Sequence, residues 1–118
     1  MKRRRKRKSK YINSVCEPCG KISEISKLVE DKTNIVIDVR SVKEYEKFHV
    51  KNTLNVPLAK IEEFIKSGKL SHYANIYSLC YSGERAKKAC EKLHGAGFGN
   101  SVCLGGIIDI SDENTVFI

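Results

Sequence analysis

The sequence lacks the features that mark membrane, secreted and repeat proteins. No apolar run approaches the roughly 20 residues needed to cross a bilayer, and the basic N-terminus lacks the apolar stretch of a secretory signal. The chain has no internal repeat, and its 118 residues suffice for one domain with a modest core. These absences predict a cytoplasmic protein whose five cysteines are reactive or buried rather than paired in disulfides.

Outside the N-terminus, the sequence has no excess of positive charge. The formal net charge is +8, from 22 lysines and arginines against 14 aspartates and glutamates. Eight of the 22 basic residues lie within residues 1–10, which leaves 14 to balance the 14 acidic residues. We expect residues 1–21 to be a basic, disordered lead-in and residues 22–118 to form the domain. The lead-in could attract RNA or another anionic surface, or act only as a solubilising extension, since no aromatic side chain lies between its charges to stack on bases.

Short β-branched runs alternate with helical patterns along the rest of the chain. Strands are expected at residues 34–39, 54–56, 75–79 and 101–104. Helices are expected after Ser23, after the capping box at 41–44, around 61–65 and at 85–94. This alternation predicts the α/β fold class, with a mostly parallel central sheet flanked by helices on both faces.

One cysteine, Cys80, lies at the junction of a predicted strand and a predicted helix. Backbone N–H groups in such a turn point toward a common centre, and the helix N-terminus adds partial positive charge there. This environment favours the nucleophilic thiolate. Gly83 permits backbone angles that other residues resist, and Arg85 supplies a permanent cation nearby. The pattern predicts an anion-binding loop with a thiolate at its base.

The segment Cys80-Tyr81-Ser82-Gly83-Glu84-Arg85 resembles the active-site loop of rhodaneses, the thiosulfate sulfurtransferase family. Three further segments resemble family motifs in the same order along the chain. They are Ile35–Arg40 followed by Glu44-Tyr45 and His49-Val50, then Asn55–Leu58, then Val102–Ile107. The resemblance covers roughly residues 22–110 and implies a single rhodanese-like domain.

The resemblance implies a two-step sulfur transfer. Four residues separate Cys80 from Arg85, whereas the related phosphatases have five, so sulfur transfer is favoured over phosphoryl transfer. The Cys80 thiolate would take a sulfane sulfur from a donor such as thiosulfate and pass it to a thiol or cyanide. The alternatives are a low-turnover persulfide carrier or partner-binding module, or a relay protein that delivers sulfur to an RNA-modification enzyme. No metal or organic cofactor is implied.

The same resemblance suggests roles for individual residues. Cys80 and Arg85 would be catalytic, and Asp38 would support the loop by accepting its N–H groups. Arg40 would steer anionic donors or form an ion pair, and Glu84 leaves the donor open because thiosulfate-preferring relatives are more basic there. The substrate-binding set is Tyr81, Ser82, Gly83, Glu84 and Arg40.

The remaining cysteines have other expected roles. Cys90 and Cys103 lie in apolar patterns and are expected in the core. Cys16 and Cys19 form a C-x-x-C pair, which could act as a redox dithiol that attacks a Cys80 persulfide, or be simply two exposed thiols. A zinc site is the less favoured alternative, because no second closely spaced cysteine pair supplies the other ligands.

Overall fold

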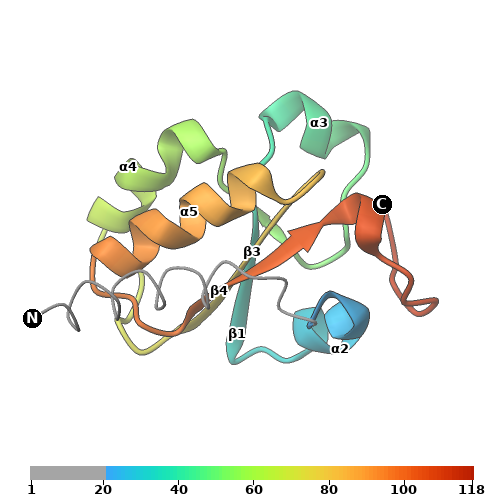
Figure 1. Cartoon of the computed structure of the whole chain (residues 1–118), viewed down its shortest axis with the longest axis horizontal. Coiled ribbons are helices and arrows are strands. Elements are labelled where there is room, and N and C mark those ends of the chain that lie inside the picture. Colours follow the sequence, from blue (N-terminus) through green and yellow to red (C-terminus); the bar gives the residue numbers. More distant parts are fainter. Residues whose placement is uncertain (1–20) are drawn as a thin grey trace, which may run out of the picture.

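The computed structural model describes residues 21–118, and Figure 1 shows the arrangement of their helices and strands. Helices alternate with strands along the chain, as the sequence predicts. In order, the elements are the 3-10 turn η1 (Lys21–Glu24), α2 (Ile25–Glu30), β1 (Asn34–Asp38), α3 (Val42–Lys47), β2 (Leu54–Asn55), the 3-10 turn η2 (Leu58–Lys60), α4 (Ile61–Lys66), β3 (Asn75–Cys80), α5 (Glu84–Gly95), β4 (Ser101–Gly106) and the 3-10 turn η3 (Ile107–Asp109).

The four strands form one parallel sheet in the order β2-β1-β3-β4. The central strands β1 and β3 run side by side over their lengths, from the pair Asn34 and Asn75 to the pair Asp38 and Leu79. Because the strands are parallel, the residues that follow β1, β3 and β4 meet at the same edge of the sheet. That edge holds the predicted reactive loop.

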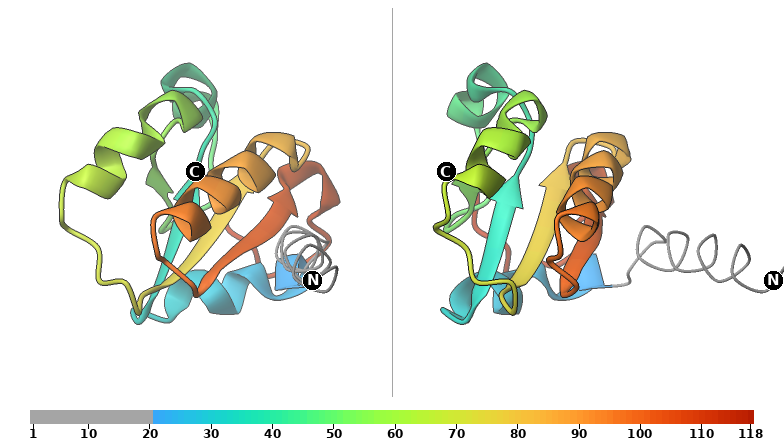
Figure 2. Two further views of the ribbon diagram at one scale, coloured as in Figure 1. Left: turned by 60° about the vertical axis from the view of Figure 1, so that its left-hand side comes forward. Right: turned by 90° about the vertical axis from the view of Figure 1, so that its left-hand side faces the viewer.

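Helices cover both faces of the sheet, as predicted. Side chains alternate between the two faces of β3, so Ile76 and Cys80 lie on the face of α5, whereas Leu79 lies on the face of α2. Helices α4 and α5 lie together, and α2 lies apart from them (Figures 1 and 2). The core on the α5 face contains Ile37, Val39, Val56, Ile61, Ile76, Cys80, Ala86, Ala89, Cys90, Leu93, Phe98 and Cys103. The core on the α2 face contains Ile25, Val36, Val50, Leu79, Leu104 and Ile107.

Local signals set some of the element boundaries. The capping box is confirmed at the start of α3, where Ser41 and Glu44 exchange side-chain and backbone hydrogen bonds. The first α-helix begins at Ile25 rather than directly after Ser23, because residues 21–24 form a 3-10 turn. Among the described residues, no helix has both the length and the apolar character that a membrane span requires.

The last residues of the chain pair with the segment after α3, which the sequence did not predict. Val50 and Phe117 form an antiparallel bridge, and His49 exchanges two backbone hydrogen bonds of 2.8 Å with Ile118. The Phe48 and Phe117 rings meet edge to face, with centroids 6.1 Å apart. This pairing fixes the 48–51 segment against the last residues of the chain.

Candidate active site

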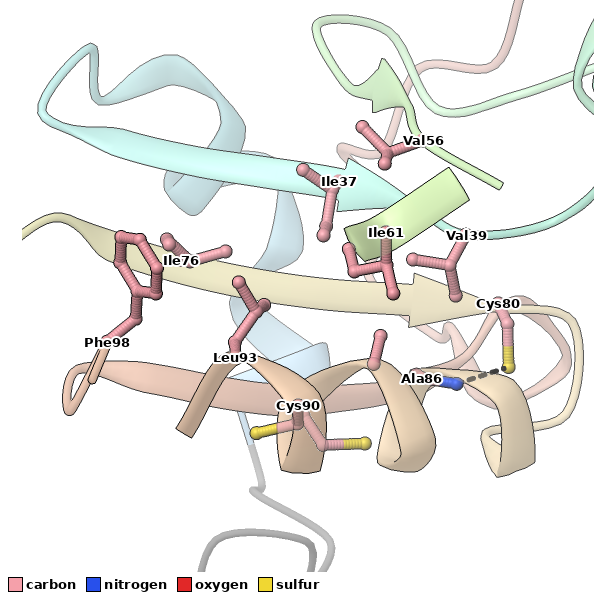
Figure 3. Close-up of a cluster of buried hydrophobic side chains, with 12 residues drawn as sticks. Ile37, Val39, Val56, Ile61, Ile76, Cys80, Ala86, Cys90, Leu93 and Phe98 are labelled. Carbon is pink, nitrogen blue, oxygen red and sulfur yellow. Dashed lines mark hydrogen bonds between the residues drawn. The ribbon is translucent and has the colours of Figure 1, made fainter. Parts of the chain in front are cut away.

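The sulfur of Cys80 accepts hydrogen bonds from two backbone N–H groups. The strand β3 ends at Cys80, the chain turns at residues 81–83, and α5 begins at Glu84. The N–H of Gly83 donates to Sγ at 2.9 Å, and the N–H of Ala86, in the first turn of α5, donates at 3.4 Å. Figure 3 shows the Cys80 side chain facing that helical turn. Cys80 itself is buried, with 1% of its surface exposed.

The loop has this shape because of two glycines. Gly83 has φ 104°, a left-handed conformation that other residues adopt only with strain. Gly106 lies opposite Cys80 in the sheet, and a Cβ there would come within 2.6 Å of Ser82 Cα. The loop therefore packs directly on the backbone of β4, and the N–H of Ile108, in the η3 turn after β4, donates to the Tyr81 carbonyl at 3.1 Å.

Arg85 makes a two-pronged ion pair with Glu44 across the reactive edge. Arg85 Nη1 lies 2.7 Å from Glu44 Oε1, and Nη2 lies 3.2 Å from Oε2. The hydrogen bond from Arg85, followed by that from the Ser41 N–H, lowers the pKa of Glu44 to about 2. Glu44 in turn raises the pKa of the Arg85 guanidinium. Both side chains are a little over one-third exposed, so the pair lies at the surface of the site.

Arg40 forms a buried ion pair with Asp38, one of the two roles that the sequence left open. Its Nε lies 3.0 Å from both Asp38 oxygens, and its Nη2 donates to Asp38 Oδ2 at 2.9 Å and to the Phe48 carbonyl at 2.7 Å. Asp38 also accepts the Arg40 backbone N–H at 3.0 Å. Its expected support of the Cys80 loop through that loop's N–H groups stays a prediction. The Arg40 side chain is only 2% exposed, so its part in binding a donor stays a prediction.

Some of the other residues singled out by the sequence are exposed, and others are buried. Tyr81 is 47% exposed, and Ser82 and Glu84 are also exposed, so their side chains face the solvent around the loop. Cys90 and Cys103 are buried in the core, as predicted. Cys16 and Cys19 lie outside the described residues, as does the basic segment 1–10.

Two parts of the site were missed by sequence reasoning. The sequence does not single out the Ala86 N–H as a donor to the sulfur, although any amide in the first helical turn is a candidate. The sequence assigns Glu44 to a capping box and to a family motif but does not pair it with Arg85, because the two residues are 41 positions apart. The His49 ring, from the same family motif, stacks on Tyr45, and its Nδ1 lies 2.8 Å from the Tyr45 carbonyl.

The sequence model of one protein family, the rhodanese-like domain, matches residues 21–112 of this chain. The chain belongs to this family. A solved structure titled "rhodanese with anions from E. coli" superposes with a TM-score of 0.63 at 26% identity, over 72% of this chain and 96% of that one. Its match supports the rhodanese-like fold described above.

Two curated relatives are similar to the chain in sequence. The "Putative sulfur carrier protein YrkF" of Bacillus subtilis is 32% identical over 88 residues, which are 70% of this chain and 46% of that protein. The "Thiosulfate sulfurtransferase PspE" of Escherichia coli is 29% identical over 75 residues, 64% of this chain and 72% of that protein. The chain thus spans less than half the length of the first relative, and the names support sulfur transfer at the level of the family.

Proposed function

We propose that this rhodanese-like chain is a sulfurtransferase that accepts a sulfane sulfur on Cys80 and passes it to a thiol or to cyanide. The observation that carries the proposal is the pair of N–H donors, from Gly83 and Ala86, on Cys80 Sγ at the start of a 12-residue helix. Such donors stabilise negative charge on sulfur both before and after transfer. The relatives named as sulfurtransferase and sulfur carrier support the same chemistry.

The reaction has two displacement steps. With thiosulfate as donor, the Cys80 thiolate attacks the terminal sulfur, the Sγ–S bond forms, and sulfite leaves with the electron pair of the broken S–S bond. An acceptor thiolate then attacks the outer sulfur of the Cys80 persulfide, and the Cys80 thiolate is the leaving group. Neither step needs a general base when the thiolate is already formed. The positive charge of Arg85, held by Glu44, lies where it can stabilise the anionic sulfur.

Intact-mass measurement tests the proposal. After incubation with a sulfane donor, the wild type should gain about 32 Da, the mass of one sulfur atom held in a covalent intermediate. Cys80→Ala should gain nothing, whereas Cys90→Ala, which removes a buried core thiol, should gain the same mass as the wild type. Equal gain by Cys80→Ala would show that another cysteine accepts the sulfur.

A low-turnover carrier is the second candidate. It is favoured by two exposed residues with apolar side chains, Tyr81 at 47% and Ile108 at 55% exposure, which suit contact with a protein partner. A backbone hydrogen bond joins the two residues beside the loop. A carrier would gain the sulfur but turn over slowly with cyanide. Steady-state thiocyanate release, compared with the single-turnover mass gain, separates the two candidates.

The roles of the N-terminal segment and the cytoplasmic location stay predictions. If Cys16 and Cys19 resolve the persulfide, the double variant Cys16→Ser and Cys19→Ser should hold its persulfide longer than the wild type. If residues 1–10 bind RNA or another anionic surface, their deletion should abolish that binding without changing sulfur loading.

A further inference from the structure

Residues 112–118 form a strap that is attached at both ends to other parts of the domain. At one end, the Asp112 carboxylate accepts the Ser26 N–H at 3.0 Å, in the first turn of α2. At the other end, Ile118 exchanges two backbone hydrogen bonds of 2.8 Å with His49, just after α3. The strap therefore connects α2 with the segment that follows α3.

The outer end of the strap is attached mainly through its backbone. The Val116 carbonyl accepts the Lys51 N–H at 2.8 Å, next to the two bonds between Ile118 and His49. The side chains of Val116, Phe117 and Ile118 are all exposed, so they bury little apolar surface. All residues of the strap after the first lie past the 21–112 match of the family model, so membership of the family does not account for this attachment.

The partner of the strap, His49, contacts the helix that carries Glu44. The His49 ring stacks on the Tyr45 ring with centroids 3.7 Å apart, and its Nδ1 lies 2.8 Å from the Tyr45 carbonyl. Helix α3 is only six residues long, and none of its residues is buried. Because so short and exposed a helix has no core contact to fix it, contacts such as the one with His49 determine where Glu44 lies.

From these contacts we propose that the strap positions Glu44, and through Glu44 the Arg85 cation, for sulfur loading on Cys80. The inference rests on the proposed function, and it makes His49 and Ile118 positioning residues that touch no reactant. When the bonds between Ile118 and His49 are lost, α3 samples a wider range of positions. Glu44 then holds Arg85 beside the sulfur site in a smaller fraction of molecules, and loading slows.

Two substitutions at the last residue test the attachment. Ile118→Pro removes the N–H that donates to the His49 carbonyl and keeps the preceding residue extended. Ile118→Val keeps the N–H and a branched apolar side chain. The rate of Cys80 persulfide formation, followed by intact mass, should fall by about threefold in Ile118→Pro and stay at the wild-type value in Ile118→Val. Equal rates in all three proteins would overturn the inference.

A double-mutant cycle shows whether the effect passes through Arg85. In an Arg85→Ala background no cation is left to position, so Ile118→Pro should slow loading little further. A full additional loss of about threefold in that background would mean that the strap acts on the sulfur by another route, and would overturn the positioning of Arg85.

The other end of the strap supplies the matched control. Asp112→Ala removes the carboxylate that accepts the Ser26 N–H, and it leaves the bonds between Ile118 and His49 in place. This variant should lower the urea midpoint, as the loss of a helix cap does, with no change in the loading rate. Equal slowing in Asp112→Ala and Ile118→Pro would show that general destabilisation, and not positioning, slows the reaction.

Hydrogen exchange of residues 42–47 gives a measurement that does not depend on sulfur chemistry. The amides of α3 should exchange faster in Ile118→Pro than in the wild type or Ile118→Val. Faster exchange with an unchanged loading rate would overturn the positioning role and leave the strap a purely structural one. If the wild type gains no sulfur on Cys80 from any donor, the proposed function fails, and the positioning role fails with it even where exchange shows that the strap holds α3.

Discussion

Two arginines lie past the carboxyl ends of neighbouring strands, and each binds one carboxylate, but their surroundings differ. Arg40 follows β1 and binds Asp38, two residues away, with both side chains at most 2% exposed. Arg85 follows β3 and binds Glu44, 41 residues away, with both side chains more than one-third exposed. The buried pair fixes the turn after β1, whereas the exposed pair faces the sulfur site. The difference in burial therefore gives the two ion pairs different roles. Removing one partner of a buried pair leaves the other charge uncompensated, whereas water stabilises the charge that is left when an exposed pair is broken.

The buried pair gives the largest expected effect on stability. Asp38→Asn keeps the shape of the side chain but leaves the Arg40 guanidinium buried without a counter-charge. We expect a loss of about 3 kcal/mol in the free energy of unfolding, measured by urea denaturation. The double variant Asp38→Asn with Arg40→Met should recover much of the loss, because both charges are then gone. A loss below about 1 kcal/mol in the single variant would mean that this pair behaves like a surface pair.

The exposed pair should affect chemistry more than stability. Arg85→Ala removes the cation at the site and leaves Glu44 as an unpaired anion, so Cys80 persulfide formation should slow by about tenfold or more. The free energy of unfolding should change by less than about 1 kcal/mol. Mass spectrometry of the loaded protein and urea denaturation measure the two effects.

The matched control for Arg85→Ala is Lys92→Ala on the same helix. Lys92 forms an exposed ion pair with Glu62 at 3.1 Å, two turns further along α5. It should show the same small change in stability with an unchanged loading rate. If both variants slow loading equally, then the effect belongs to the helix as a whole and not to the charge beside the sulfur.

The contrast between the pairs also shows what the sequence could predict. The strands, the capping box at α3 and the place of Cys80 at a strand–helix junction all follow from local patterns, and the structure confirms these positions. The possible ion pair of Arg40 with a neighbouring carboxylate is likewise a short-range inference. The resemblance of the loop to rhodaneses agrees with the match of the family model over residues 21–112.

The missed features all depend on tertiary contacts. The partner of Arg85 comes from α3, and only the packing of α3 against the reactive edge brings Glu44 within hydrogen-bonding distance. The register of β3 and β4 shifts between Ser78 and Leu79, which places Gly106 opposite Cys80 and against the loop. The bridge between Val50 and Phe117 joins segments that are 67 residues apart in the sequence. No local period or cap signals any of these contacts.

The smallest expected effect is the pH dependence that Glu44 contributes to stability. Its pKa of about 2 in the folded state is below the ordinary value of 4.5, so its stabilising contribution is present above pH 4.5 and is lost as the pH falls toward 2. Because Glu44 is 39% exposed, we expect under about 1 kcal/mol, well below what the shift alone would indicate. The difference in unfolding free energy between wild type and Glu44→Gln, measured by urea denaturation from pH 6 to pH 2.5, should shrink steadily with pH. Glu62→Gln, which removes the exposed partner of Lys92, should give a shallower slope over the same range. A pH-independent difference for Glu44→Gln would show that the side chain acts through the cap of α3 and not through its charge on Arg85.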